Sequence, residues 1–344
     1  MGKTAKLIDR ISTTLVAREP VLILGPPGSG KSACIKGDVK AELERRLEIE
    51  PGAMGYFDWR LAMRDPVESL GLPWVDTKEM VTRWIRPEFL PKEGPLLICM
   101  EELNLASKAH DPMIYEALTE GRVGDHALPA ETYIVATGNR KIDGCSVRKL
   151  NSAIEDRFAY FEWFADPDDW RKWARGAGLD PRVVAAPAWM PELITEFDGT
   201  SDGPVSTPRA LHKLSNVLTR GNPSSEALID HCVSYLGEIN GTRVAGFFRI
   251  FDSLISPKRI ANDPKGTEII NEPGALVALV TTLARVATSK TIEAYVTYVR
   301  RLGELNNFGR TYIEMFVRDV AEGNPAAAKS EAFIEFAAEN PVLI

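Results

Sequence analysis

Short apolar runs alternate with longer amphipathic segments along the first half of the chain. Four of these runs have the length and composition of buried strands: residues 21–24, 55–59, 95–100 and 132–136. Apolar residues recur at helical spacing in residues 4–18 and again in residues 31–47. Strands that alternate with helical stretches predict an α/β fold, in which helices cover both faces of a parallel sheet.

The pattern changes near residue 165, and the remainder of the chain has mainly helical spacing. Asp166 has the place of a helix N-cap, and Pro167 follows it in the first turn. Residues 262–266 are rich in turn formers and predict a linker between two helical units. Three apolar stripes are expected to form core: Leu276, Leu279, Val280 and Leu283; Tyr295, Val299 and Leu302; and Ile313, Phe316, Val317 and Val320. The predicted domains are an α/β core (residues 1–165), a helical domain (166–264) and a C-terminal helical extension (265–344).

A phosphate-binding loop is predicted between the first strand and the helix that follows it. Residues 25–32 are G-P-P-G-S-G-K-S, which fits the pattern G-x-x-x-x-G-K-[ST]. A strand that turns sharply into a helix points several N–H groups into one concavity, where polyphosphate binds. Lys31 adds a mobile charge for the β- and γ-phosphates, and the Ser32 hydroxyl can ligate Mg²⁺. An ordinary glycine turn is the alternative, and it explains the flanking strand and helix less well. The expected nucleoside triphosphate site comprises Gly25, Pro26, Pro27, Gly28, Ser29, Gly30, Lys31, Ser32 and Ala33.

Two glutamates directly follow the apolar run of residues 95–100. A strand that ends in two acids suits a triphosphate site, because one acid can hold Mg²⁺ through water while the next polarises the attacking water. We assign Glu101 to the metal and Glu102 to the water. In the alternative, both glutamates simply favour the N-terminus of the next helix. Ligands of parallel sheets bind beyond the C-terminal strand ends, which favours the catalytic interpretation.

Three further polar residues are candidates for the same site. Asn139 closes the fourth strand in Thr137-Gly138-Asn139, where its amide could bind both the γ-phosphate and the attacking water; a plain turn is the alternative. Arg157 precedes an apolar segment, and Arg209 stands at the start of a helix. A well-placed arginine accelerates phosphoryl transfer by neutralising developing charge. Either arginine could instead be a surface charge.

Composition narrows the class of protein. With 344 residues and 44% hydrophobic content, the chain can bury the cores of two or three compact units. A net charge of −7 argues against a broad basic surface for nucleic acid, but it does not exclude a local basic channel. The four cysteines and four histidines lack metal-ligand spacing, so neither a zinc site nor a disulfide framework is expected. No apolar run is long enough to span a membrane, and we expect a soluble, cytoplasmic protein.

Taken in order, the segments from about residue 4 to residue 215 resemble the AAA+ ATPases, and within them the MoxR-like and dynein-related group. Residues 25–32 are similar to the Walker A motif, and L-L-I-C-M-E-E-L-N (residues 96–104) is similar to the Walker B strand. A-T-G-N resembles sensor 1, the stretch from residue 150 to residue 158 resembles the arginine-finger segment, and T-P-R-A resembles sensor 2. Further similarities favour the subgroup: D-P with L-G-L-P (residues 65–73), E-F-L-P (88–91), G-R-V-G (121–124) and D-W with W-A (169–174).

The resemblance implies a Mg²⁺-dependent, hexameric ring ATPase with ATP between subunits. Arg157 of one subunit would complete its neighbour's site, while Arg209 on a helical lid would sense the nucleotide in its own or an adjacent subunit. The family usually has Asp where Glu101 stands, so slow turnover, or a ring held in its ATP state as a scaffold, is an open alternative. MoxR-like ATPases resemble chaperones that remodel or activate partner proteins, often ones with a von Willebrand factor A domain.

The sequence leaves the client, ring size, pathway and role of residues 265–344 open. Residues 61–94 form a long connection that holds Trp74 and Trp84, and we hypothesise that part of it touches the client. Packing of both tryptophans onto the domain's own body is the alternative. A nucleic-acid motor is a second functional hypothesis, which predicts salt-dependent binding of DNA or RNA.

Overall fold

The computed structural model describes residues 2–145, 147–252, 254–270, 272–305 and 309–341. The chain forms two compact units, one of residues 3–164 with 198–200, and the other made mainly of the chain from Ala165 onward. We call them the α/β unit and the helical unit. The predicted boundaries at residues 165 and 264 stay predictions. No helix in the described ranges is long and apolar enough to cross a membrane.

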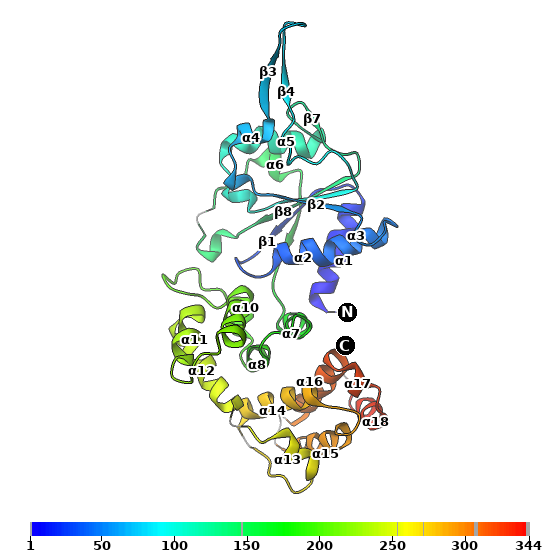
Figure 1. The fold of residues 1–344 in the computed structure, drawn as a ribbon, viewed down its shortest axis with the longest axis vertical. Coiled ribbons are helices and arrows are strands. Elements are labelled where there is room, and N and C mark those ends of the chain that lie inside the picture. The colour runs from blue at the N-terminus through cyan, green and yellow to red at the C-terminus, as the bar shows by residue number, and fades with distance from the viewer. Residues whose placement is uncertain (1, 146, 253, 271, 306–308, 342–344) are drawn as a thin grey trace. The chain divides into compact units, whose positions relative to one another are not determined.

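A parallel sheet forms the centre of the α/β unit (Figure 1). Its five strands are in the order β2-β5-β8-β1-β9. Its strands are β1 (Val21–Leu24), β2 (Gly55–Trp59), β5 (Leu96–Met100), β8 (Thr132–Gly138) and β9 (Ala159–Glu162). Strand β8, which carries Asn139 at its end, separates the loop-bearing β1 from the acid-bearing β5. The predicted α/β fold with a parallel sheet is confirmed, and β9 is an additional edge strand that we did not predict.

Alternate residues of the central strands pack against helices on opposite faces of the sheet. Helices α1 (Lys3–Val16), α2 (Lys31–Cys34) and α3 (Lys40–Arg46), with the π-helical turn η1 (Ile35–Val39), cover the face of Ile23, Cys99 and Val135. Helices α5 (Asp111–Thr119) and α6 (Ser152–Glu155) cover the face of Leu22, Ile98 and Ala136. Burial on both faces explains why these strands are apolar at nearly every position. The single helix predicted over residues 31–47 is thus divided by a π-helical turn.

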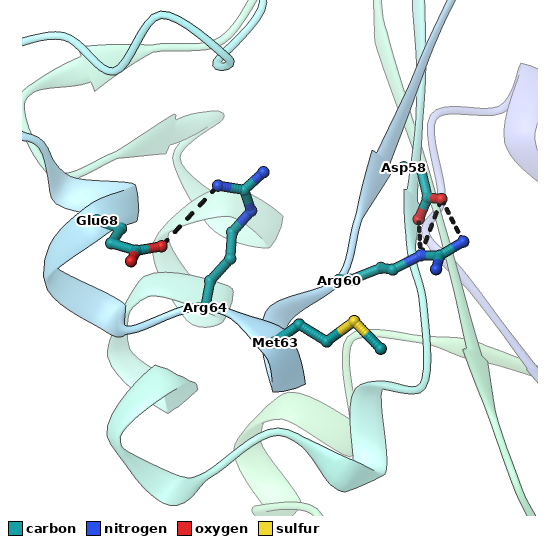
Figure 2. Close-up of a pocket in the computed structure, with 5 residues that line it drawn as sticks. All are labelled: Asp58, Arg60, Met63, Arg64 and Glu68. Carbon is teal, nitrogen blue, oxygen red and sulfur yellow. Dashed lines mark hydrogen bonds and ion pairs between the residues drawn. The ribbon is translucent and has the colours of Figure 1, made fainter.

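The chain between β2 and β5 contains a β-hairpin where the sequence predicted only a long connection. Strands β3 (Leu72–Asp76) and β4 (Val81–Ile85) pair antiparallel, with Leu72 opposite Ile85, and the hairpin projects away from the central sheet (Figure 1). Trp74 is 51% exposed and Trp84 is 38% exposed, so neither packs into the unit's core. Near the base of the hairpin, Arg64 lies beside Glu68 of α4 (Pro66–Leu70) (Figure 2).

Short elements complete the α/β unit. These are η2 (Leu61–Met63), η3 (Leu103–Leu105), η4 (Lys108–His110), η5 (Lys141–Asp143), and the paired strands β6 (Arg122–Val123) and β7 (His126–Ala127).

The helical unit begins where the N-cap was predicted. The Asp166 side chain accepts hydrogen bonds from the N–H groups of Asp168 and Asp169 at the start of α7. The first group of helices comprises α7 (Pro167–Gly176), α8 (Pro181–Trp189), α9 (Glu192–Thr195), α10 (Pro208–Asn216), the π-helical η6 (Val217–Gly221), α11 (Leu228–Leu236) and α12 (Glu238–Asp252). The second comprises α13 (Pro257–Asn262), α14 (Pro273–Val286), α15 (Ile292–Leu302), α16 (Gly309–Gly323), α17 (Pro325–Ala328) and α18 (Glu331–Glu339).

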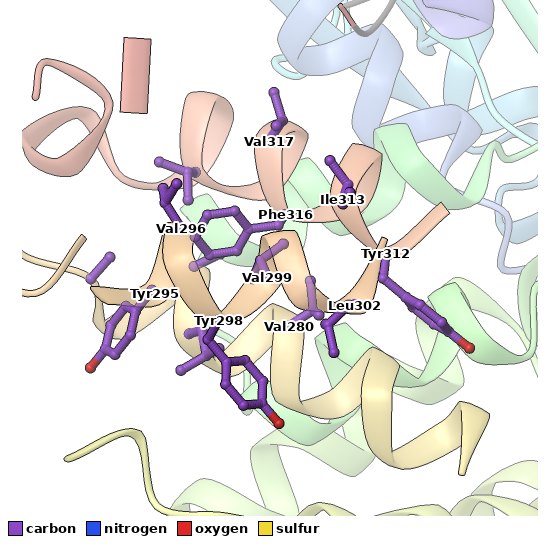
Figure 3. Packing of buried hydrophobic residues seen from close by; sticks show 14 of the residues in the cluster. Val280, Tyr295, Val296, Tyr298, Val299, Leu302, Tyr312, Ile313, Phe316 and Val317 are labelled. Carbon is purple, nitrogen blue, oxygen red and sulfur yellow. The ribbon is translucent and has the colours of Figure 1, made fainter. Parts of the chain in front are cut away.

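All three predicted apolar stripes lie in one buried cluster of the second group, which Figure 3 shows from close by. They come from α14, α15 and α16, so their prediction as core is confirmed. Ile260 of α13 belongs to the same cluster, whereas Ala278 of α14 packs in the cluster of the first group. The two groups therefore share α14 within one compact unit.

Candidate nucleotide-binding site

The loop of residues 25–32 connects β1 to α2, and its backbone depends on glycine at two points. Gly28 has φ 72° and Gly30 has φ 96°, a left-handed region that other residues rarely adopt. Gly25 is constrained by space instead, because a Cβ there would lie 2.5 Å from the carbonyl oxygen of Trp163. The Trp163 indole N–H also donates to Ser29 O at 3.0 Å. Trp163, which directly follows β9, therefore supports the loop at Gly25 and at Ser29.

Lys31 and Asn139 meet at the mouth of this loop. The Lys31 ammonium donates to Gly25 O and Pro26 O, both at 2.8 Å, and to Asn139 Oδ1 at 3.4 Å. Both side chains are largely buried. A buried ammonium beside the N-terminus of a helix concentrates positive charge where a phosphate would bind. The structure thus brings together two of the predicted site residues.

Glu101, which directly follows β5, contacts Ser32, the neighbour of Lys31. Its Oε2 accepts a hydrogen bond from Ser32 Oγ at 2.6 Å and another from Thr137 Oγ1 at 3.1 Å. Its Oε1 lies 3.7 Å from Cys99 Sγ. Burial, reinforced by the Glu101 charge, raises the pKa of the Cys99 thiol, so Cys99 remains a protonated donor. Three donors therefore surround one largely buried carboxylate.

The donor set around Ser32 and Glu101 fits Mg²⁺. A hydroxyl and a carboxylate provide hard oxygen ligands, and their contact places both at one point beside the loop. The described part of the chain has no cluster of three or more His, Cys, Asp or Glu side chains that could hold a metal ion. Mg²⁺ usually binds through one or two protein oxygens together with substrate phosphates, so this sparse set suits a metal that arrives with a nucleotide.

Glu102 is the exposed member of the acidic pair, and its backbone is unusual. Its φ of 52° and ψ of 44° lie in the left-handed region, and its N–H donates to Thr137 Oγ1 at 3.0 Å. The sharp turn separates the two carboxylates, because Glu101 is buried against the loop while Glu102 is exposed. Such a division would suit one acid for a metal and the other for water, and the assignment of these two roles stays a prediction.

Asn104 and Thr137 are site residues whose roles sequence reasoning missed. Asn104 Nδ2 donates to Asn139 O at 2.7 Å, and its Oδ1 accepts from Asn139 N at 3.2 Å. A Cβ on Gly138 would lie 3.1 Å from Asn104 Oδ1, so glycine there leaves room for the amide. Both residues lie within the motifs described above. The register between β5 and β8 places Asn104 beside Asn139, and Thr137 beside Glu101 and Glu102. Trp163 was also missed, since no sequence pattern marks it.

In the described part of the α/β unit, no hydrogen bond or ion pair joins Arg157 to Lys31, Ser32, Glu101 or Asn139. The Arg157 guanidinium lies 4.2 Å from the centre of the Tyr115 ring and donates to the Tyr115 hydroxyl at 2.7 Å and to Ala153 O at 2.5 Å. Arg209 is exposed in the first turn of α10, in the helical unit. Their assignments, and that of Ala33, which is exposed at the start of α2, stay predictions.

Two neighbouring cavities lie in the chain that follows β2, away from the loop. The first, of about 370 Å³, is lined by Asp58, Arg60, Met63, Arg64 and Glu68 (Figure 2). Hydrogen bonds to Asp58 raise the pKa of Arg60, and the charges of Glu101 and Glu102 reinforce the shift. The second, of about 490 Å³, is mainly apolar and reaches the base of the hairpin at Leu72 and Ile85. Neither cavity is lined by a residue of the phosphate-binding loop.

No protein-family model and no curated protein sequence matches the chain. Several solved structures are similar over most of its length. NtrX from Brucella abortus in complex with ADP is 12% identical, with 99% of this chain and 70% of that chain covered and a TM-score of 0.41. The RuvB Holliday junction branch migration motor of Thermotoga maritima is 14% identical, with 98% and 88% covered and a TM-score of 0.32. The assignment of the fold rests on the strand order and loop geometry described above.

Proposed function

We propose that this protein is a ring-forming, Mg²⁺-dependent ATPase of the AAA+ type, which couples ATP hydrolysis to remodelling or activation of a partner protein. The observation that carries the proposal is a pair of hydrogen bonds beside the loop, one from Lys31 to Asn139 and the other from its neighbour Ser32 to Glu101. A loop for phosphates, an oxygen site for a metal and an exposed acid are the parts that hydrolysis of a nucleoside triphosphate requires.

Each residue then has a distinct task. The loop N–H groups and Lys31 bind the β- and γ-phosphates, and Ser32 with Glu101 would hold Mg²⁺, which neutralises charge on the phosphate oxygens. Glu102 orients the attacking water and accepts its proton. The Asn139 amide donates to the γ-phosphate, and Lys31 fixes the orientation of that amide through its contact with Oδ1.

Phosphate release from ATP tests this proposal directly. The wild-type chain is expected to release phosphate only with Mg²⁺. Lys31→Ala should lose ATP binding, whereas Glu102→Gln should bind ATP and lose turnover. No affinity of the wild type for Mg-ATP would refute the proposal. Binding without phosphate release over hours would instead favour the ATP-gated scaffold.

Ring assembly is proposed from Arg157, which contacts Tyr115 and Ala153 of its own subunit. In a ring, this arginine would reach the γ-phosphate bound to a neighbouring subunit, where its positive charge would stabilise the negative charge that develops during hydrolysis. Arg157→Ala should then bind ATP yet lose hydrolysis. Mixing the wild type with Glu102→Gln should inhibit turnover more than in proportion to the added variant. A linear decrease would argue against sites shared between subunits.

We propose that the β3–β4 hairpin contacts a client protein. Proteins with a von Willebrand factor A domain are the proposed class of client. Its support is the exposure of Leu72, Val75 and Met80 together with both tryptophans on a two-stranded ribbon. Large apolar side chains grouped on a surface mark protein interaction sites. Trp74→Ala with Trp84→Ala should abolish stimulation of hydrolysis by the client and spare the basal rate. Trp189→Ala, which removes an exposed tryptophan of the helical unit, is the matched control. Equal loss of basal and stimulated rates would indicate a folding role.

A further inference from the structure

Strands β5 and β8 each provide a polar side chain that holds the end of the other. From β8, the Thr137 hydroxyl reaches both acids that follow β5. From the segment after β5, the Asn104 amide closes two hydrogen bonds with the backbone of Asn139. The candidate catalytic residues at these two strand ends are therefore positioned across the sheet, rather than by their own strands alone.

Thr137 uses both hydrogen-bonding capacities of its hydroxyl on the acidic pair. The hydroxyl donates to Glu101 Oε2 at 3.1 Å and accepts from the N–H of Glu102 at 3.0 Å. Thr137 is 1% exposed, so water cannot replace either bond. One side chain thus connects the carboxylate assigned to the metal with the backbone of the acid assigned to water.

The two bonds constrain the Glu101 carboxylate and the backbone of Glu102. Glu101 has one methylene more than the aspartate usual in the related motif, and therefore one additional rotatable bond. Ser32 and Thr137 both bind its Oε2, which fixes that longer carboxylate against the loop. The backbone of Glu102 is in the left-handed conformation, which residues other than glycine, asparagine and aspartate seldom adopt. The bond from its N–H to Thr137 stabilises that turn and hence the direction of its side chain.

We propose that Thr137 is a positioning residue for ATP hydrolysis, whose hydroxyl fixes the metal-side Glu101 and the water-side Glu102 relative to each other. The inference rests on the proposed ATPase function. It explains how a glutamate can stand at position 101, since the extra length is absorbed by the shared bond to Oε2. It also makes a prediction that core packing does not make, because only the hydroxyl, and not the methyl group, should matter for turnover.

The test compares Thr137→Val, which keeps the shape and loses the hydroxyl, with Thr137→Ser, which keeps the hydroxyl. For Thr137→Val, we expect kcat to fall by about 10- to 100-fold, as for outer residues that orient metal ligands. The KM for ATP should stay within about threefold of wild type, because the loop itself is unchanged. The Mg²⁺ concentration for half-maximal rate should rise. Thr137→Ser should restore both kcat and the Mg²⁺ concentration for half-maximal rate to their wild-type values.

A double variant shows whether Thr137 acts through the acid. If it does, the two losses should not be additive: Thr137→Val combined with Glu102→Gln should lower the residual kcat by less than the product of the two separate losses. A kcat of Thr137→Val near that of wild type would overturn the inference. So would equal loss of kcat in Thr137→Val and Thr137→Ser, or a failure of both variants to fold, since the residue would then be structural. Absence of phosphate release in the wild type would be a different result, because it refutes the ATPase function itself.

Discussion

Replacing Asp319 with alanine is expected to destabilise the helical unit strongly, because its carboxylate is shared by two arginines of another helix. Arg171 and Asp319 have side chains that are 3% and 2% exposed, and their Nη2 and Oδ2 atoms are 2.9 Å apart. Arg175 Nη1 lies 2.9 Å from Asp319 Oδ1. The network joins α7, the first helix of the unit, to α16 in its C-terminal group. Its loss therefore tests whether the C-terminal helices are an integral part of this unit.

The expected loss in the free energy of unfolding depends on the contacts that Arg171 and Arg175 would keep in the variant. Removing one partner of a buried ion pair costs about 3–5 kcal/mol, because the remaining charge has neither solvent nor partner. Arg171 would keep a hydrogen bond to Val184 O at 3.2 Å and a 3.6 Å ion pair with the exposed Asp168. Arg175 would keep Glu322 at 2.9 Å. These remaining contacts place the loss near the lower limit, at about 3 kcal/mol in the free energy of unfolding.

Urea unfolding, followed by tryptophan fluorescence and far-ultraviolet circular dichroism, measures this loss. Trp170 and Trp173 flank Arg171 along α7 and contact each other, so they report on the helix that the network holds. Glu314→Ala is the matched control, because it removes an ion pair on α16 whose partner Arg310 is 79% exposed. That change should cost less than about 0.5 kcal/mol. If Asp319→Ala cost no more than the control, the network would contribute no stability and the reasoning would be refuted.

Of three further predictions, two concern the candidate site and the third concerns the free thiols. Gly138→Ala should lower kcat, because its Cβ would lie 2.8 Å from Leu24 Cδ2 and would also crowd the amide that holds Asn139; an unchanged kcat would contradict this close packing. Trp163→Phe removes the bond to Ser29 O, so ATP affinity should fall about fivefold for a bond worth about 1 kcal/mol, and an unchanged Kd would show that the loop needs no such support. Iodoacetamide at about pH 8, followed by mass spectrometry, should label the half-buried Cys145 first. Burial raises the pKa of all four thiols, but most strongly those of the three buried ones, which leaves them little thiolate; early labelling of a buried thiol would contradict this order. The slow thiols are Cys34, Cys99 and Cys232, the last with its pKa raised to about 12.

The central strands could be predicted because both of their faces are buried. Leu96–Met100 is apolar and buried at every position, and no other element fits so short an apolar run before a charged pair. β9 lies at the edge of the sheet, where Tyr160 is exposed and the four residues only alternate in burial. So short an alternation is indistinguishable from a loop in the sequence.

The hairpin escaped prediction for a different reason. Two β-rich runs that surround Trp74 and Trp84 are separated by four residues, which is a hairpin signal that could have been used. Their side chains are those of a buried segment, yet the ribbon projects from the unit and leaves them exposed. Local sequence does not distinguish an apolar residue that packs inside its own unit from one that stays on the surface.

At the candidate site, the rule that ligands bind beyond strand ends predicted one site for Lys31, Glu101 and Asn139. In the structure, Lys31 contacts Asn139, and its neighbour Ser32 contacts Glu101. What the rule could not provide is the register of β5 against β8, in which Met100 lies opposite Ala136. That register places Thr137 beside the acidic pair. A slip by one residue would turn Thr137 to the other face of the sheet and separate it from both glutamates. The register depends on how the buried side chains of both strands pack against two helical layers, so it is a property of the whole unit. The candidate nucleotide-binding residues can thus be predicted from local motifs, whereas the residues that hold them in position depend on the fold.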